Sequence, residues 1–211
     1  MTTPTIKTVL ITGSNRGIGR ILLTSYLLRP SHTVIAAVRN PSHPSSQSLL
    51  SLPVHPSGTT RLVIVKLDLN ERTDPAAAVK ELAEKHGIDT IDVVIANASV
   101  GYIWPKLRDV EVDDIRAHME TNVFGFAELV KGLLPVLECT AAKKAEKGED
   151  KEVVWVTIGS GGGVLNVSSS FLASLASSWS IPCVWTVYLE GYGTCEERCL
   201  KERRGDVTKR S

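Results

Sequence analysis

A glycine-rich turn that directly follows a short apolar run is the feature that most limits the fold of this chain. The run KTVLIT, residues 7–12, is rich in β-branched residues and stops at Gly13, as a strand buried on both faces does. The turn carries Gly13, Gly17 and Gly19, and a helix is predicted over residues 17–28. Strand, glycine turn and helix in this order are typical of a site that binds the phosphates of a dinucleotide.

Each glycine of the turn has its own predicted role. Gly13 permits the tight turn out of the strand. Gly17 lets backbone N–H groups approach a pyrophosphate, and Gly19 lets the helix pack closely on the sheet. Glycine triplets also arise by chance, but this triplet lies between a strand and a helix, which is the context that the motif requires.

Strands and helices continue to alternate after the turn. Asp74 is predicted to cap a helix with Pro75 at its first position, and a Ser/Pro-rich loop is predicted over residues 41–58. Further strands are predicted over 33–38, 61–67, 91–96 and 153–158, and further helices over 74–86 and 112–137. This order predicts an α/β fold, a doubly wound, Rossmann-like parallel sheet with right-handed crossovers and helices on both faces.

Length and composition exclude several classes of protein. The 211 residues suffice for one domain, and the net charge of +1 argues against a nucleic-acid partner. The N-terminus lacks a signal peptide and the most apolar stretch, residues 171–187, is interrupted by serines and Pro182, so we expect no membrane span and a cytoplasmic protein. Among the four cysteines only Cys195 and Cys199 are close in sequence, which favours free thiols over a zinc site.

Three motifs, in order along the chain, resemble those of the short-chain dehydrogenase/reductase family. TGSNRGIG at 12–19 resembles the Thr-Gly-x-x-x-Gly-x-Gly signature, and Asn97-Ala98 resembles the Asn-Ala-Gly segment, with Ser99 where glycine is usual. Asn122, in TNVFG, resembles the helix asparagine of the catalytic tetrad. The phrases at 32–41 and 86–98 resemble fungal polyketide ketoreductases of the norsolorinic acid ketoreductase type. This resemblance, over residues 6–160, implies a reductase of secondary metabolism whose substrate is a small-molecule ketone.

Charge at the end of the second strand favours NADPH over NADH. Enzymes that prefer NADH usually carry an acid there, whereas this chain has Arg39, with Arg16 in the glycine turn beside it. Two guanidiniums suit a 2′-phosphate, which they can bind bidentately. The alternative is that both are solvated surface charges.

The resemblance implies further contacts to the coenzyme. Asp68 would bind the adenine amino group, or it is a simple turn aspartate; Asn97 would contact the ribose and brace the sheet. Lys131 would face the coenzyme, or it is a solvated helix lysine. The coenzyme-binding residues implied are Gly13, Asn15, Arg16, Gly17, Ile18, Gly19, Arg39, Asp68, Asn97 and Lys131.

The catalytic residues implied by the resemblance are incomplete in this sequence. Ser160 fits the serine that holds the carbonyl oxygen, although a plain turn serine is an alternative, and Asn122 fits the asparagine. The family also needs a tyrosine with a lysine four residues later, because the ammonium lowers the pKa of the phenol. Tyr188 is followed at that spacing by Tyr192, and Tyr192 by Glu196, so no such pair is found.

The last part of the chain lacks the family's motifs. Residues 1–160 are predicted to form an NADP-binding Rossmann-like domain, and 161–211 an irregular segment without the remaining strands, so that the edge of the fifth strand is exposed. Two hypotheses follow: an NADPH-dependent ketoreductase, whose activity the missing pair puts in question, or a non-catalytic coenzyme-binding paralogue. The resemblance leaves a homo-oligomer open, through the helix of Asn122.

Overall fold

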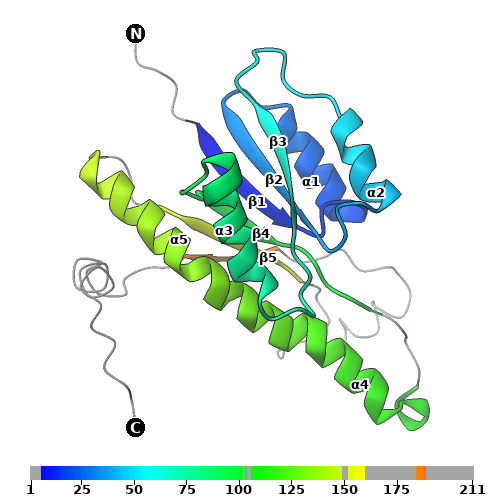
Figure 1. Ribbon diagram of the computed structural model, residues 1–211. Helices are drawn as coiled ribbons and strands as arrows, with labels where there is room; N and C mark the ends of the chain where they lie inside the picture. Colours follow the sequence, from blue (N-terminus) through cyan, green and yellow to red (C-terminus); the bar gives the residue numbers. More distant parts are fainter. Residues whose placement is uncertain (1–5, 102, 104–105, 149–151, 160–183, 189–211) are drawn as a thin grey trace, which may run out of the picture.

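The computed structural model describes residues 6–101, 103, 106–148, 152–159 and 184–188, which form alternating strands and helices (Figure 1). The elements, in chain order, are β1 (Lys7–Thr12), α1 (Gly17–Leu27), β2 (His32–Val38), α2 (Pro44–Gln47), the 3-10 turn η1 (Ser48–Ser51), β3 (Arg61–Lys66), α3 (Asp74–His86), β4 (Val93–Ala96), the 3-10 turn η2 (Leu107–Asp109), α4 (Val112–Met119), the π-helical turn η3 (Glu120–Gly125), α5 (Phe126–Glu146), β5 (Val154–Ile158) and β6 (Val184–Tyr188).

The strands form one sheet in the order β3-β2-β1-β4-β5-β6. The first five are parallel, and the order reverses between β1 and β4, which is the switch point of a doubly wound fold. The predicted fold class is therefore confirmed. Ligands of such sheets bind outside the carboxyl ends of the strands at the switch point, where the turn after β1 lies.

The edge of β5 is covered, so the prediction that it is exposed is wrong. β6 pairs with β5 in antiparallel register, from Val154 opposite Tyr188 to Ile158 opposite Val184. The run VWTVY, 184–188, consists of β-branched and aromatic residues, which favour a strand. It satisfies backbone groups of β5 that would otherwise lack a neighbouring strand.

Two apolar cores lie on opposite faces of the sheet. Alternate residues of a strand point to opposite faces, so Val9 and Ile11 pack with Leu23 and Leu27 of α1. Leu10 instead belongs to the core that α3 and α5 cover. Burial on both faces explains why β1 is an uninterrupted apolar run, and it fixes the carboxyl ends of the strands in place.

Several predicted boundaries differ from the structure. Residues 41–58, predicted as a loop, include α2 and η1. The N-cap of α3 is Thr73, and Asp74 is its first residue. The carboxylate of Asp74 accepts a hydrogen bond from the backbone N–H of Asp68 (2.9 Å) and pairs with Lys66, so it joins the end of β3 to α3 instead of capping the helix. The helix predicted over 112–137 is interrupted by η3 and continues to Glu146.

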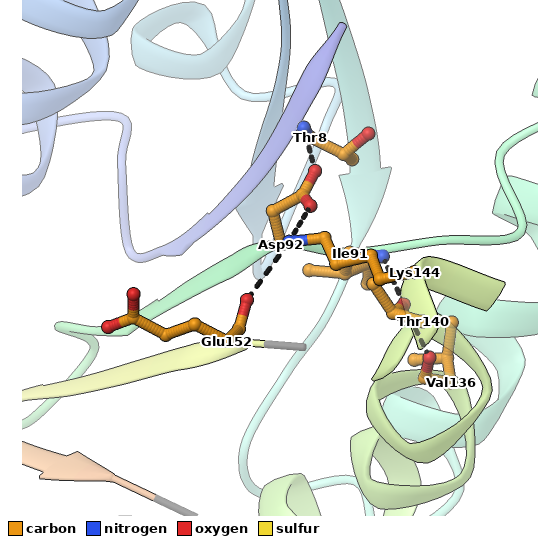
Figure 2. A network of polar contacts seen from close by, with 7 residues as sticks. All are labelled: Thr8, Ile91, Asp92, Val136, Thr140, Lys144 and Glu152. Carbon is orange, nitrogen blue, oxygen red and sulfur yellow. Dashed lines mark hydrogen bonds and ion pairs between the residues drawn. The ribbon is translucent and has the colours of Figure 1, made fainter. Parts of the chain in front are cut away.

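Polar contacts, several of them buried, join the amino ends of three strands to α5 (Figure 2). The carboxylate of Asp92 accepts from the backbone N–H of Thr8 (2.7 Å) and pairs with the ammonium of Lys144 (2.7 Å). That ammonium also donates to the backbone carbonyl of Glu152 (2.9 Å), just before β5. Beside this pair, the hydroxyl of Thr140 accepts from the backbone N–H of Ile91 (2.9 Å). This network, which the sequence did not predict, lies at the sheet edge opposite the glycine turn.

Within the described part of the chain, no helix is both long and apolar enough to cross a membrane.

Candidate coenzyme-binding site

The turn between β1 and α1 uses backbone conformations that favour glycine. Gly13 has a φ of +63° and Gly17 a φ of +55°, both in the left-handed region that other L-residues rarely adopt. The backbone N–H of Gly13 donates to the carbonyl of Ala37 (2.9 Å), which ties the turn to the end of β2. A Cβ on Gly17 would meet no atom within 4 Å, so the space beside this residue is open to a ligand.

Gly19 is required by close packing rather than by its φ. A Cβ at this position would lie 2.5 Å from the side-chain nitrogen of Asn97 and 2.6 Å from the carbonyl oxygen of Gly13. Neither atom can withdraw freely, because both belong to the same hydrogen-bonded junction. The first turn of α1 therefore lies directly on the carboxyl ends of β1 and β4.

Thr12 and Asn97 form that junction. The hydroxyl of Thr12 accepts from the backbone N–H groups of Asn97 (3.0 Å) and Ala98 (2.9 Å). The amide nitrogen of Asn97 donates to the carbonyls of Thr12 (2.9 Å) and Gly13 (3.3 Å). Asn97 thus braces the sheet at the switch point, whereas its contact with a ribose remains a prediction. The role of Thr12 was missed, although it is the first residue of the recognised motif.

The turn also contains a buried hydroxyl without a partner. Ser14 is fully buried, and its Oγ makes no hydrogen bond with the residues that the structure describes. An unsatisfied buried hydroxyl costs about 1–3 kcal/mol. Together with two left-handed residues and open space beside Gly17, this cost fits a turn shaped for a ligand rather than for stability alone.

Arg16, Ile18 and Arg39 face solvent around this turn. Within the described residues, neither guanidinium has an acidic partner or other contact. The side chain of Asn15 instead points to the segment after β2, where its nitrogen donates to Ser45 Oγ (2.7 Å). Arg16 in the turn, Arg39 after β2 and the backbone N–H groups at the start of α1 therefore lie at the same end of the sheet, an arrangement that can bind an anion.

Asp68 follows β3 at the same edge of the sheet and is half-buried. Its carboxylate accepts from the backbone N–H of Asn70 (3.1 Å), as a turn aspartate does. The hydrogen bond from Lys66 to Asp74, followed by their charge attraction, raises the pKa of Lys66 above its ordinary value. Because the Lys66 ammonium is directed to Asp74, Asp68 remains available to accept from an adenine amino group.

Asn122 lies in the π-helical turn η3 and holds the segment after β4. Its oxygen accepts from the backbone N–H of Val100 (2.9 Å), and its nitrogen donates to the Val100 carbonyl (2.9 Å). π-helical turns occur frequently at functional sites. Asn122 also lines a cavity of about 330 Å³, together with Ile103, Val110, Asp114, Ile115, His118, Met119 and Val123.

The other residues considered in the sequence are Lys131, Ser160, Tyr192 and Glu196. Lys131 is exposed and pairs with Glu128 (2.9 Å), which matches the alternative of a solvated helix lysine. Ser160, Tyr192 and Glu196 lie outside the described residues. The structure thus brings the glycine turn, Asn97 and Arg39 to the carboxyl ends of the strands, and Asn122 of η3 contacts the segment that follows β4.

Comparison with known proteins gives a family match over most of the chain. The family model described as short chain dehydrogenase matches residues 7–174. The norsolorinic acid ketoreductase of Dothistroma septosporum is 41% identical over 139 residues, which cover 66% of this chain and 51% of that protein. The short chain dehydrogenase gsfK of Penicillium aethiopicum is 36% identical over 165 residues. This match covers 78% of this chain and 61% of that protein. The chain therefore spans between half and two thirds of these relatives.

Solved structures with the same fold include the NADPH-bound carbonyl reductase from chicken fatty liver. Its TM-score is 0.57 at 26% identity, and the match covers 67% of this chain and 55% of that one. An NADH-dependent reductase complexed with NAD has a TM-score of 0.55 at 21% identity, and the match covers 69% of this chain and 57% of that one. At this identity the likeness supports the fold alone.

Proposed function

The chain belongs to the short-chain dehydrogenase family, and on this premise we propose that it binds NADPH and reduces a small-molecule ketone of fungal secondary metabolism. The proposal is carried by the glycine turn, which has open space beside Gly17, and by two exposed arginines at the same end of the sheet, Arg16 in the turn and Arg39 after β2. The norsolorinic acid ketoreductase of Dothistroma septosporum supports the substrate class through its 41% identity.

NADPH would supply the hydride, and the residues of this chain would bind and orient both reactants. The N–H groups at the start of α1 would bind the pyrophosphate, and Arg16 and Arg39 the 2′-phosphate. Asp68 would accept from the adenine, and Asn97 from a ribose hydroxyl. Asn122 keeps the segment around Val100 in place, and Ser160 would donate to the carbonyl oxygen of the ketone.

The proposal is tested by titrating the full chain with NADPH and NADH, and then by following NADPH oxidation with an aromatic ketone. We expect NADPH to bind more tightly than NADH, because the site contributes two cations and no acid at the end of β2. Equal affinity for the two coenzymes would contradict the assignment of NADPH.

Arg39→Asp should weaken NADPH binding far more than NADH binding. The change removes a charge-assisted pair with the 2′-phosphate and adds repulsion, which together cost about 2–3 kcal/mol, or about a hundredfold in Kd. The measurement is the ratio of the two dissociation constants by fluorescence titration. Lys80→Asp makes the same change of net charge on the exposed side of α3 and should leave the ratio unaltered.

A non-catalytic coenzyme-binding protein is the second candidate, and one observation favours it. Neither tyrosine after Ser160 is followed four residues later by lysine, and Tyr192 is followed by Glu196. A carboxylate beside a phenol raises the pKa of the phenol and disfavours proton donation at neutral pH. NADPH binding without measurable turnover of any ketone would select this candidate.

We also propose a cytoplasmic protein that forms a homo-oligomer through α4. Several large apolar side chains of α4 and η3 are exposed, among them Val112 (60%), Ile115 (49%) and Phe124 (48%). Exposed apolar side chains gathered on one helix are typical of an interaction surface. Light scattering of the full chain measures the oligomeric state directly.

A further inference from the structure

Charge is distributed very unevenly along this chain. Residues 1–67 include seven Lys and Arg but no Asp or Glu, so every acidic residue lies at or after Asp68. This basic segment, residues 1–67, contains the glycine turn, the end of β2 and α2. Asp68, after β3, is the first carboxylate along the chain, so the basic segment itself has none to neutralise a cation or accept a hydrogen bond beside the turn, and an anionic ligand is a natural partner for donors there.

His43 is a residue of the basic segment whose contacts favour one tautomer of the neutral ring. Its Nδ1 accepts from the backbone N–H of Ser45 (3.2 Å), so that nitrogen cannot itself carry a proton. Ser45 Oγ lies 2.8 Å from the same nitrogen and accepts from Asn15 at 2.7 Å, which directs its own proton to the ring. The neutral ring therefore carries its proton on Nε2, and the residue is exposed.

The contacts of Ser45 bring His43 next to the candidate coenzyme site. Ser45 Oγ joins the ring to Asn15, so two hydrogen bonds separate the imidazole from the glycine turn. The backbone N–H of His43 donates to the carbonyl of Asn40 (3.2 Å), which turns the chain back after Arg39. His43 is thus held between the turn and the end of β2, where the 2′-phosphate of NADPH would lie.

We propose that His43 is a specificity-determining residue of the coenzyme site, whose Nε2–H donates to the 2′-phosphate, with Asn15 and Ser45 positioning the ring. This inference rests on the proposed function. It adds a third donor, from the β2–β3 connection, to the guanidiniums of Arg16 and Arg39. NADH has no phosphate at that position, so His43 contributes to the choice between the two coenzymes.

The chain contains a matched control for this geometry. His55-Pro56-Ser57 repeats the sequence His43-Pro44-Ser45, and Nδ1 of His55 again accepts from the backbone N–H of Ser57 (3.2 Å). Ser57 Oγ, however, contacts Thr59 (2.7 Å) rather than the glycine turn. Each histidine therefore forms the same kind of local turn with the serine two residues later. Of these two turns, the one of His43 is hydrogen-bonded to the glycine turn, through Ser45 and Asn15.

The test measures binding of adenosine 2′,5′-bisphosphate and adenosine 5′-monophosphate to the full chain by calorimetry. We expect His43→Ala to weaken binding of the bisphosphate about tenfold or more, because a hydrogen bond to a charged group is lost, and to change monophosphate binding less than about twofold. His55→Ala should change neither. His43→Gln keeps an N–H near the position of Nε2 and should restore part of the discrimination.

The outcomes separate this inference from the proposed function. If Arg39→Asp weakens bisphosphate binding but His43→Ala does not, NADPH binding stands and the role of His43 is wrong. Equal losses for both nucleotides in His43→Ala would show a general effect on the turn and also overturn the inference. If the unaltered chain binds neither the bisphosphate nor NADPH, the proposed function itself fails.

Discussion

Asp92→Ala should lower the free energy of unfolding by about 3–5 kcal/mol, which is the usual cost of removing one partner from a buried ion pair. The Asp92 side chain is 11% exposed and that of Lys144 is 17% exposed. Without the carboxylate, the Lys144 ammonium keeps a single partner among the described residues, the Glu152 carbonyl, and the N–H of Thr8 loses the acceptor that it has in the structure. Urea unfolding at neutral pH, followed by circular dichroism, measures the change.

A neighbouring exposed pair provides the control for this prediction. Asp89 pairs with Lys143, one residue before Lys144, but the Asp89 side chain is 69% exposed. Asp89→Ala should cost less than about 1 kcal/mol, because exposed pairs contribute little. The double variant Asp92→Ala, Lys144→Met should recover part of the loss, since it removes the unpaired charge. If Asp92→Ala and Asp89→Ala lower the free energy of unfolding by the same amount, burial of the Asp92–Lys144 pair does not matter for stability.

Gly17→Val should abolish binding of NADPH and NADH while leaving the far-ultraviolet circular dichroism close to that of the unaltered chain. A Cβ would project into the open space beside the turn, which a pyrophosphate needs, and a φ of +55° is strained for a branched residue. We expect at least about a hundredfold loss of affinity, corresponding to about 2.7 kcal/mol. Fluorescence titration measures the dissociation constants.

Gly58→Val separates strain from obstruction. Gly58 has a φ of +71° and, like Gly17, no atom within 4 Å of the position that a Cβ would take, but it lies in the connection before β3. Both variants should lose similar stability from the strained backbone, and only Gly17→Val should lose coenzyme binding. Retained binding in Gly17→Val would mean that this turn does not hold a phosphate.

The features predicted well from the sequence are those with a local signal. β1, Gly13 and α1 follow one another directly, so apolar periodicity and glycine placement are enough to locate them. β6 was missed because its five residues lie in a Gly- and Ser-rich region, and its partner β5 is distant in sequence. A short strand is decided by such pairing rather than by its own propensity.

The parts of the site that the sequence missed depend on long-range contacts. Asn15 and Ser45 are 30 residues apart, and no pattern in the segment after β2 shows that it folds back on the glycine turn. Asp92 likewise falls inside the strand predicted over 91–96 and received no role in the sequence analysis, although it joins Thr8 to Lys144. For Lys131 the sequence suggested a contact with the coenzyme, whereas its side chain is exposed and pairs with Glu128. Spacing along a helix does not show which face of the helix is turned to solvent.

The π-helical turn η3 lies between α4, whose side chains are not held in the core, and α5, which the core fixes in place. α4 has no buried residue, whereas α5 buries five, Leu129, Leu133, Val136, Leu137 and Thr140. A π turn contains one residue more than an α turn and takes up that residue in a wider turn, so the helices on its two sides keep nearly the same relative orientation. In evolutionary terms, a lineage can gain or lose a single codon at this turn and inherit an unchanged core on α5, while the local backbone around Asn122 changes.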